Sequence, residues 1–138
     1  MVLAVAIATV FGACKKPKDP ADPLEMKEKL AKQVKMLWWK VDASDGQKEQ
    51  VDRLLDGIAP DLFAMQEENK ALTRGLIDAM DADPVDVARV DRLRGEATAL
   101  FGRYLERMQR GLVDFAGILT VDQRRELIGL WRKYESGD

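Results

Sequence analysis

One short pattern occurs twice in this chain of 138 residues, as SDGQ at residues 44–47 and as TVDQ at residues 120–123. A Ser or Thr with a Gln three residues later is a capping box, in which each side chain hydrogen-bonds to the backbone N–H of the other residue at a helix start. Asp22 and Asp83 each precede a proline, which is tolerated in the first turn of a helix. The sequence therefore predicts four helices, over residues 23–41, 45–80, 84–118 and 121–135.

Apolar residues recur every three or four positions within all four segments, and no segment alternates between apolar and polar residues. We therefore expect an all-α fold with helices in the order short, long, long, short. The connection of three residues between the long helices forces them to run antiparallel as a hairpin. Gly57 and Pro60 fall inside the second helix. We expect a kink there rather than an end and a restart, because the apolar spacing continues in phase.

The charge and composition exclude several classes of function. The chain has 22 Lys and Arg against 24 Asp and Glu, so its net charge of −2 does not suit a nucleic-acid-binding protein. It contains no histidine and one cysteine, which removes the usual proton shuttle, the common nucleophile pairs and the commonest zinc ligand. We expect a binding protein rather than an enzyme, with no cofactor and no metal site.

The N-terminal stretch predicts export. Residues 1–13 are apolar and uncharged, and residues 11–14, FGAC, resemble a bacterial lipobox. This resemblance implies a signal peptide over residues 1–13, a lipid on Cys14, a tether over residues 14–21 and a helical domain over residues 22–136. By the sorting rule of such proteins, Lys15 implies the outer membrane, with the domain facing the periplasm. The alternative is an apolar N-terminal arm with an incidental cysteine.

The second capping box extends to LTVDQ at residues 119–123, which is similar to the L-T-x-x-Q motif of the Spy/CpxP and heavy-metal-resistance proteins of bacterial envelopes. ASDGQ at residues 43–47 resembles a degenerate first copy. The resemblance implies a curved hairpin that dimerises into a cradle and acts as an ATP-independent chaperone or an envelope-stress modulator. The alternative is a heavy-metal sensor or buffer, against which the missing histidine argues. In both copies we expect the motif to cap helices, through Ser44, Gln47, Leu119, Thr120 and Gln123.

The candidate binding residues lie on the first and third helices. Trp38 and Trp39 are neighbours and point about 100° apart, so one can enter the core while the other joins an exposed binding surface with Met36. The alternative is a core role for both tryptophans. Arg103, Arg107 and Arg110 share one helix face and form a candidate basic patch, for which the alternative is a solvated face of ion pairs.

The expected partners follow from these features. Two short helices cover only part of a long hairpin, so we expect a homodimer to bury the remaining apolar stripe. Unfolded or envelope proteins, or a sensor kinase, are the expected clients. Contact with the membrane is expected through the lipid anchor only, and no contact with nucleic acid is expected. Four acidic residues gather where the long helices join: Asp78, Asp81, Asp83 and Asp86. Capping and favourable placement in the helix dipole explain Asp83 and Asp86 without a metal ion.

Overall fold

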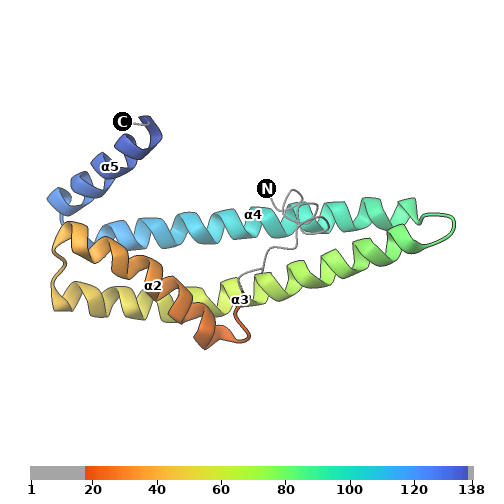
Figure 1. Ribbon diagram of the computed structural model, residues 1–138, viewed down its shortest axis with the longest axis horizontal. Coiled ribbons are helices and arrows are strands. Elements are labelled where there is room, and N and C mark those ends of the chain that lie inside the picture. Colours follow the sequence, from red (N-terminus) through yellow and green to blue (C-terminus); the bar gives the residue numbers. More distant parts are fainter. Residues whose placement is uncertain (1–17, 137–138) are drawn as a thin grey trace. The chain divides into compact units, whose positions relative to one another are not determined.

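The computed structural model describes residues 18–136, and this part of the chain is all-α, as predicted (Figure 1). Its helices are α2 (Pro23–Val41), α3 (Asp45–Asp81), α4 (Val87–Ile118) and α5 (Val121–Ser136). No strand occurs among the described residues. None of the helices in this part combines the length and apolar character needed to cross a membrane. The predicted signal peptide and Cys14 lie outside the described residues.

The start of α4 differs from the prediction. The helix begins at Val87 rather than at Pro84, because Asp86 provides the cap in place of Asp83. The Asp86 carboxylate accepts the backbone N–H of Arg89 at 3.0 Å, and its carbonyl accepts that of Val90 at 3.0 Å. The N–H of Asp86 in turn donates to the carbonyl of Ala79 at 3.0 Å. This last bond ties the connecting turn to the end of α3 and leaves Asp83 in the turn.

The other helix starts form where the sequence places them. Asp22 accepts the N–H of Glu25 at 2.8 Å, and Glu25 accepts the N–H of Ala21 at 2.8 Å, one residue further back than in a capping box. At the end of α2, Asp42 adopts a left-handed conformation with φ of 46°. Such a residue is common just after a helix C-terminus.

Helix α3 continues through Pro60 as one helix, so the alternative of an end and a restart is wrong. Proline removes one backbone N–H from the ladder and leaves the carbonyl four residues earlier without its helical partner. Gly57 and Pro60 are both exposed, so water can solvate this part of the backbone. The neighbouring Ala59 and Leu62 are buried, and their packing keeps the helix continuous on its other side.

The chain divides into two compact units, and each contains part of both long helices. The hairpin unit comprises Ala64–Glu106 with the segment up to Asp19, so it holds the end of α3, the turn and the start of α4. Its buried apolar residues are Ala79 and Leu100. A side chain at Gly75 would lie 3.3 Å from Leu93, so the two helices approach each other closely at this point.

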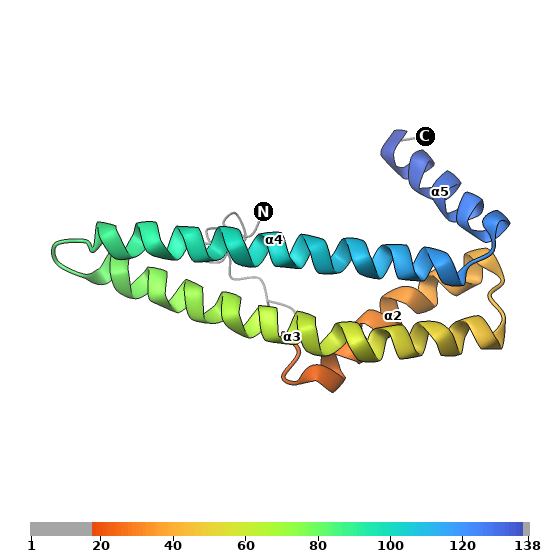
Figure 2. The same cartoon turned by 180° about the vertical axis from the view of Figure 1, so that it is seen from behind.

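The junction unit comprises Pro20–Phe63 and Arg107–Asp138, of which residues up to 136 are described. It holds α2, the first part of α3, the last part of α4, and α5. Within this unit α2 lies against α3 and α4, as Figures 1 and 2 show from opposite sides. Nine buried apolar residues form its core: Met26, Val41, Ala43, Val51, Leu55, Ile58, Ala59, Leu62 and Leu119. The junction unit therefore holds most of the buried apolar residues of the described chain.

Candidate functional site

The two repeated motifs form complete capping boxes in the junction unit. The Gln47 amide oxygen accepts the N–H of Ser44 at 3.0 Å, and the Ser44 hydroxyl accepts the N–H of Gln47 at 3.2 Å. Thr120 and Gln123 make the same two bonds at 2.9 and 3.2 Å. Leu119 makes no capping bond itself and is instead buried. Each box satisfies two backbone donors that a helix start otherwise leaves without partners.

The two glutamines also bond to each other, which sequence reasoning missed. The Gln47 Nε2 donates to the Gln123 Oε1 at 2.8 Å, and the Gln123 Nε2 donates to the Gln47 Oε1 at 3.1 Å. Gln47 further donates to the carbonyl of Ile118 at 3.0 Å, and Gln123 to that of Val41 at 3.0 Å. We call this pair the glutamine clasp. It joins the ends of α2 and α4 to the starts of α3 and α5, and the repetition of the motif was its only signal in the sequence.

An apolar cavity of about 390 Å³ lies between α2, α3 and α4 of the junction unit. Gly111 helps to shape it, because a side chain there would lie 2.9 Å from the Cδ1 of Ile58. Leu112, on the same helix, lines the cavity and is 53% exposed, so apolar surface of the cavity wall reaches solvent. Gln33 and Arg107 are the polar residues of a lining that is otherwise aliphatic, aromatic, Met and Gly.

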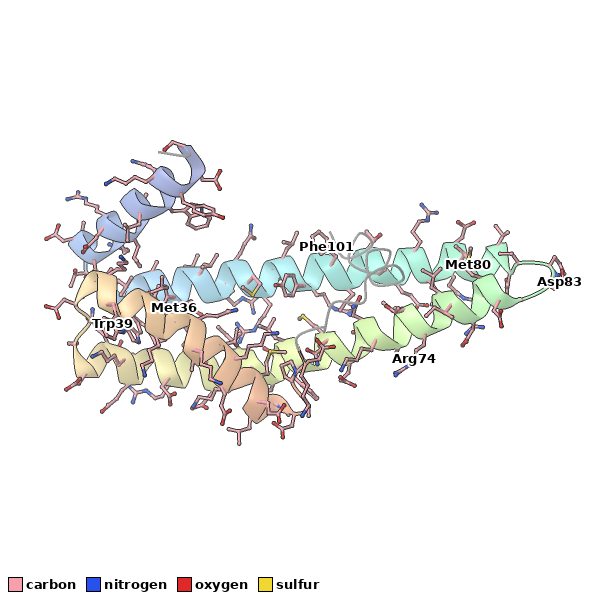
Figure 3. All side chains as sticks on the ribbon, viewed as in Figure 1. Met36, Trp39, Arg74, Met80, Asp83 and Phe101 are labelled. Carbon is pink, nitrogen blue, oxygen red and sulfur yellow. The ribbon has the colours of Figure 1, made fainter. Side chains whose placement is uncertain are left out.

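The three binding candidates on α2 separate onto two faces. Trp38 packs on Phe115 of α4 with ring centroids 5.8 Å apart. Trp39 is 85% exposed and Met36 is 68% exposed, so the alternative of a core role for both tryptophans does not hold. Met36 and Trp39 line a shallow hollow with Lys32 and Lys35, and Figure 3 shows both labelled residues towards the C-terminal end of α2.

The three candidate arginines of α4 do not form an uncompensated basic patch. The Arg103 Nη2 lies 2.6 and 2.7 Å from the two carboxylate oxygens of Glu68 in the hairpin unit. The Arg107 Nε lies 2.6 Å from the Asp61 carboxylate in the junction unit. Arg110 is exposed and also interacts within the described chain. This arrangement matches the alternative reading of a face of ion pairs, and at least two of the three charges are compensated.

Lys27 joins α2 to α3 through two carboxylates. Its Nζ lies 2.7 Å from Asp56 and 2.9 Å from Asp52. The hydrogen bonds, first to Asp56 and then to Asp52, raise the pKa of Lys27 above its ordinary value of 10.5. In the hairpin unit, the hydrogen bond from Lys70 lowers the pKa of Glu67 below 4.5. These hydrogen bonds favour the charged forms of Lys27 and Glu67.

Within residues 18–136, no three or more His, Cys, Asp or Glu side chains lie close enough together to hold a metal ion. Two of the acidic residues near the turn make other interactions. Asp86 caps α4, and Asp78 lies 3.8 Å from Arg89.

A model of the heavy-metal resistance protein family matches residues 2–126, which is most of the chain. The chain belongs to the heavy-metal resistance family. Neither the curated proteins nor the solved structures gave a significant match. In this member of the heavy-metal resistance family, the described candidate site is a helical junction with an apolar cavity.

Proposed function

We propose that this protein is a periplasmic, lipid-anchored stress protein that binds apolar segments of unfolded or partner polypeptides. The observation that carries the proposal is the apolar cavity of the junction unit. Cavities of about 300–1,000 Å³ with a mostly apolar lining and a few polar groups are typical binding sites. The cavity of about 390 Å³, with Gln33 and Arg107 as its polar lining residues, fits that description.

The chemistry of such binding needs neither a nucleotide nor a cofactor. Burial of one Leu, Ile, Val, Phe or Met side chain of a client contributes about 1.5–3 kcal/mol. Ordering of the client segment offsets part of that gain, so contacts through a few side chains stay weak and reversible. Met108, which lines the cavity, adds a flexible side chain that adapts to different apolar shapes.

Dimerisation is part of the proposal. Helix α5 exposes apolar side chains that nothing in one copy of the described chain buries, including Ile128, Trp131 and Tyr134. A second copy is the simplest partner for such a surface, because symmetric dimers are the commonest assemblies of soluble proteins. The lipid on Cys14 would hold the protein at the outer membrane.

The test is suppression of client aggregation, with reduced insulin as the client and light scattering as the measurement. The protein is expected to suppress scattering at a stoichiometric ratio. Leu112→Ser places a hydroxyl in the lining of the cavity, and this variant is expected to lose at least half of the suppression. Its matched control is Val113→Ser. Val113 is the next residue, is 70% exposed and does not line the cavity, so this variant is expected to retain suppression.

Two results would contradict the proposal. One is an absence of suppression by the wild-type chain at equal concentration. The other is an equal loss in both serine variants, which would show that the cavity has no particular role.

A second candidate function is metal sensing or buffering, which the family match favours. Calorimetry with Zn²⁺, Cu²⁺ and Ni²⁺ distinguishes the two functions. If the protein binds polypeptides rather than metal, no heat of binding is expected at micromolar metal concentrations. Binding with a micromolar or lower Kd would place metal binding first.

A further inference from the structure

The solvent-facing side of α2 concentrates positive charge. Residues 29–41, KLAKQVKMLWWKV, contain four lysines and no acidic residue, in a chain whose net charge is −2. The four are Lys29, Lys32, Lys35 and Lys40, and all are exposed. This basic segment is therefore a local exception to a slightly acidic protein.

Two large apolar side chains lie among these lysines. Met36 and Trp39 follow Lys32 at spacings of four and seven residues, which places them on the same side of the helix. Met36, Trp39, Lys32 and Lys35 surround one shallow hollow. Leu30 and Val34 point the other way and line the apolar cavity. Neither Met36 nor Trp39 contributes to that cavity, so their exposure calls for a separate explanation.

The four lysines also lack the compensation found elsewhere in the protein. Lys27, on the same helix, lies within 2.9 Å of two carboxylates, and Arg103 and Arg107 each have one. Among the described residues, no carboxylate pairs with Lys29, Lys32, Lys35 or Lys40. Their charge is thus available to an external anionic partner.

We propose that this face of α2 docks on the surface of an anionic phospholipid bilayer. Amphipathic helices that lie on membranes combine Lys on the polar face with Trp and other apolar side chains that enter the headgroup region. Tryptophan is enriched at membrane interfaces because its ring is apolar and its N–H is polar. An acidic protein would satisfy the lysines alone, whereas a bilayer also accounts for the exposed Trp39 and Met36.

This docking extends the expected lipid anchorage. The patch lies on the first helix of the described chain, directly after the expected tether. The inference does not depend on client binding, because the cavity lies on the other side of α2.

The test is co-sedimentation of the full chain with two kinds of vesicle. One is phosphatidylcholine alone, and the other contains roughly 30% phosphatidylglycerol, which gives the anionic surface that attracts basic segments. The variant Lys32→Gln/Lys35→Gln is expected to lower the partition coefficient on anionic vesicles about 30-fold, which corresponds to about 1 kcal/mol for each lysine. Trp39→Ser is expected to lower it about tenfold through lost apolar burial.

The matched control is Arg132→Gln/Lys133→Gln, which removes the same charge from exposed positions of α5. It leaves residues 1–17 and the face of α2 intact, so its partition coefficient is expected to stay within about threefold of wild type, the size of effect expected of charges that bulk salt screens. Circular dichroism of each variant verifies that the helices are retained.

Three outcomes would overturn the proposal. The first is equal binding of the wild-type chain to both vesicle types. The second is an equal effect of the α2 and α5 variants. The third is sensitivity to the lysines alone, with no effect of Trp39→Ser and full competition by polyglutamate, which would identify an acidic polypeptide as the partner.

Discussion

The hairpin unit and the junction unit are built from the same two long helices, yet they are stabilised differently. Two described residues of the hairpin unit are buried apolar side chains, Ala79 and Leu100, against nine in the junction unit. Ion pairs join the two long helices in both units, as Arg103 with Glu68 in the hairpin unit and Arg107 with Asp61 in the junction unit. Two helices alone enclose one narrow apolar seam, whereas a third helix encloses a core.

This difference indicates where each unit is sensitive to mutation. In the junction unit, α2 packs against the first part of α3 and the last part of α4, and the glutamine clasp joins four helix ends. In the hairpin unit, exposed ion pairs contribute little free energy, typically below about 1 kcal/mol each. We therefore expect the hairpin unit to open more readily than the junction unit.

The largest expected effect comes from truncation of a buried leucine in each unit. Leu62→Ala in the junction unit and Leu100→Ala in the hairpin unit each leave a cavity that costs about 3 kcal/mol. Hydrogen exchange measured by mass spectrometry is expected to rise within residues 64–106 for Leu100→Ala and within the junction unit for Leu62→Ala. The exposed Leu24→Ala is the control. Equal acceleration throughout the chain in both variants would show that the two units unfold as one.

The next largest effect on stability is expected from removal of one amide of the glutamine clasp. Gln123→Ala leaves the Thr120 N–H and the Val41 carbonyl without that partner, so the free energy of unfolding is expected to fall by about 2 kcal/mol. Urea denaturation measures the change, and Gln50→Ala on the exposed surface of α3 is the control. Because the two amides share bonds, Gln47→Ala/Gln123→Ala is expected to cost less than the two single variants together. Strict additivity would contradict a shared clasp.

The link between α2 and α3 depends on pH. The pKa of Lys27 is raised above 10.5, so its contribution to stability is complete below pH 10.5 and is lost as the pH rises through the raised pKa. Lys27→Met is expected to lower the urea midpoint at neutral pH, and its difference from wild type is expected to shrink at alkaline pH. Lys29→Met, which removes a lysine that pairs with no described carboxylate, is the control. A difference that stays constant above the raised pKa would show that packing alone is responsible.

The smallest effect compares one glycine from each unit. A side chain at Gly102 in the hairpin unit meets nothing within 4 Å, so Gly102→Ala is expected to stabilise the protein by about 0.5–1 kcal/mol. At Gly111 in the junction unit the new methyl group would lie 2.9 Å from the Cδ1 of Ile58. Ile58 would have to move, and the cost of that movement is expected to offset the gain in stability from replacing glycine. Thermal denaturation of the two variants tests this. An equal rise in Tm would indicate that the junction core is less tightly packed than the structure shows.

Most of the fold could be predicted from local sequence, because capping and apolar spacing act within one helix. The start of α4 could not. Asp83 and Asp86 are both good caps in isolation. The choice depends on the bond between the Asp86 N–H and the Ala79 carbonyl, which exists only once the turn has formed. The sequence alone does not reveal that bond.

The site was less predictable, because its contacts join distant parts of the chain. Because Trp38 and Trp39 are adjacent on α2, the sequence indicates that they face different directions. Which of them packs inwards is settled by the contact of Trp38 with Phe115 of α4. The arginines of α4 suggested either a patch or ion pairs, and the answer depends on the register of α3 against α4. The bonds of Arg103 to Glu68 and of Arg107 to Asp61 result from that register.

The clasp explains why both capping boxes contain glutamine. The start of α2 uses Glu25, which needs only to accept a hydrogen bond from the backbone. Gln47 and Gln123 must also donate, each to the other and to the last carbonyl of another helix, Ile118 of α4 for Gln47 and Val41 of α2 for Gln123. A carboxylate in either place would accept but could not donate, and two would repel each other. The neutral amide is thus a self-complementary connector, so identical residues can serve on both sides of the junction.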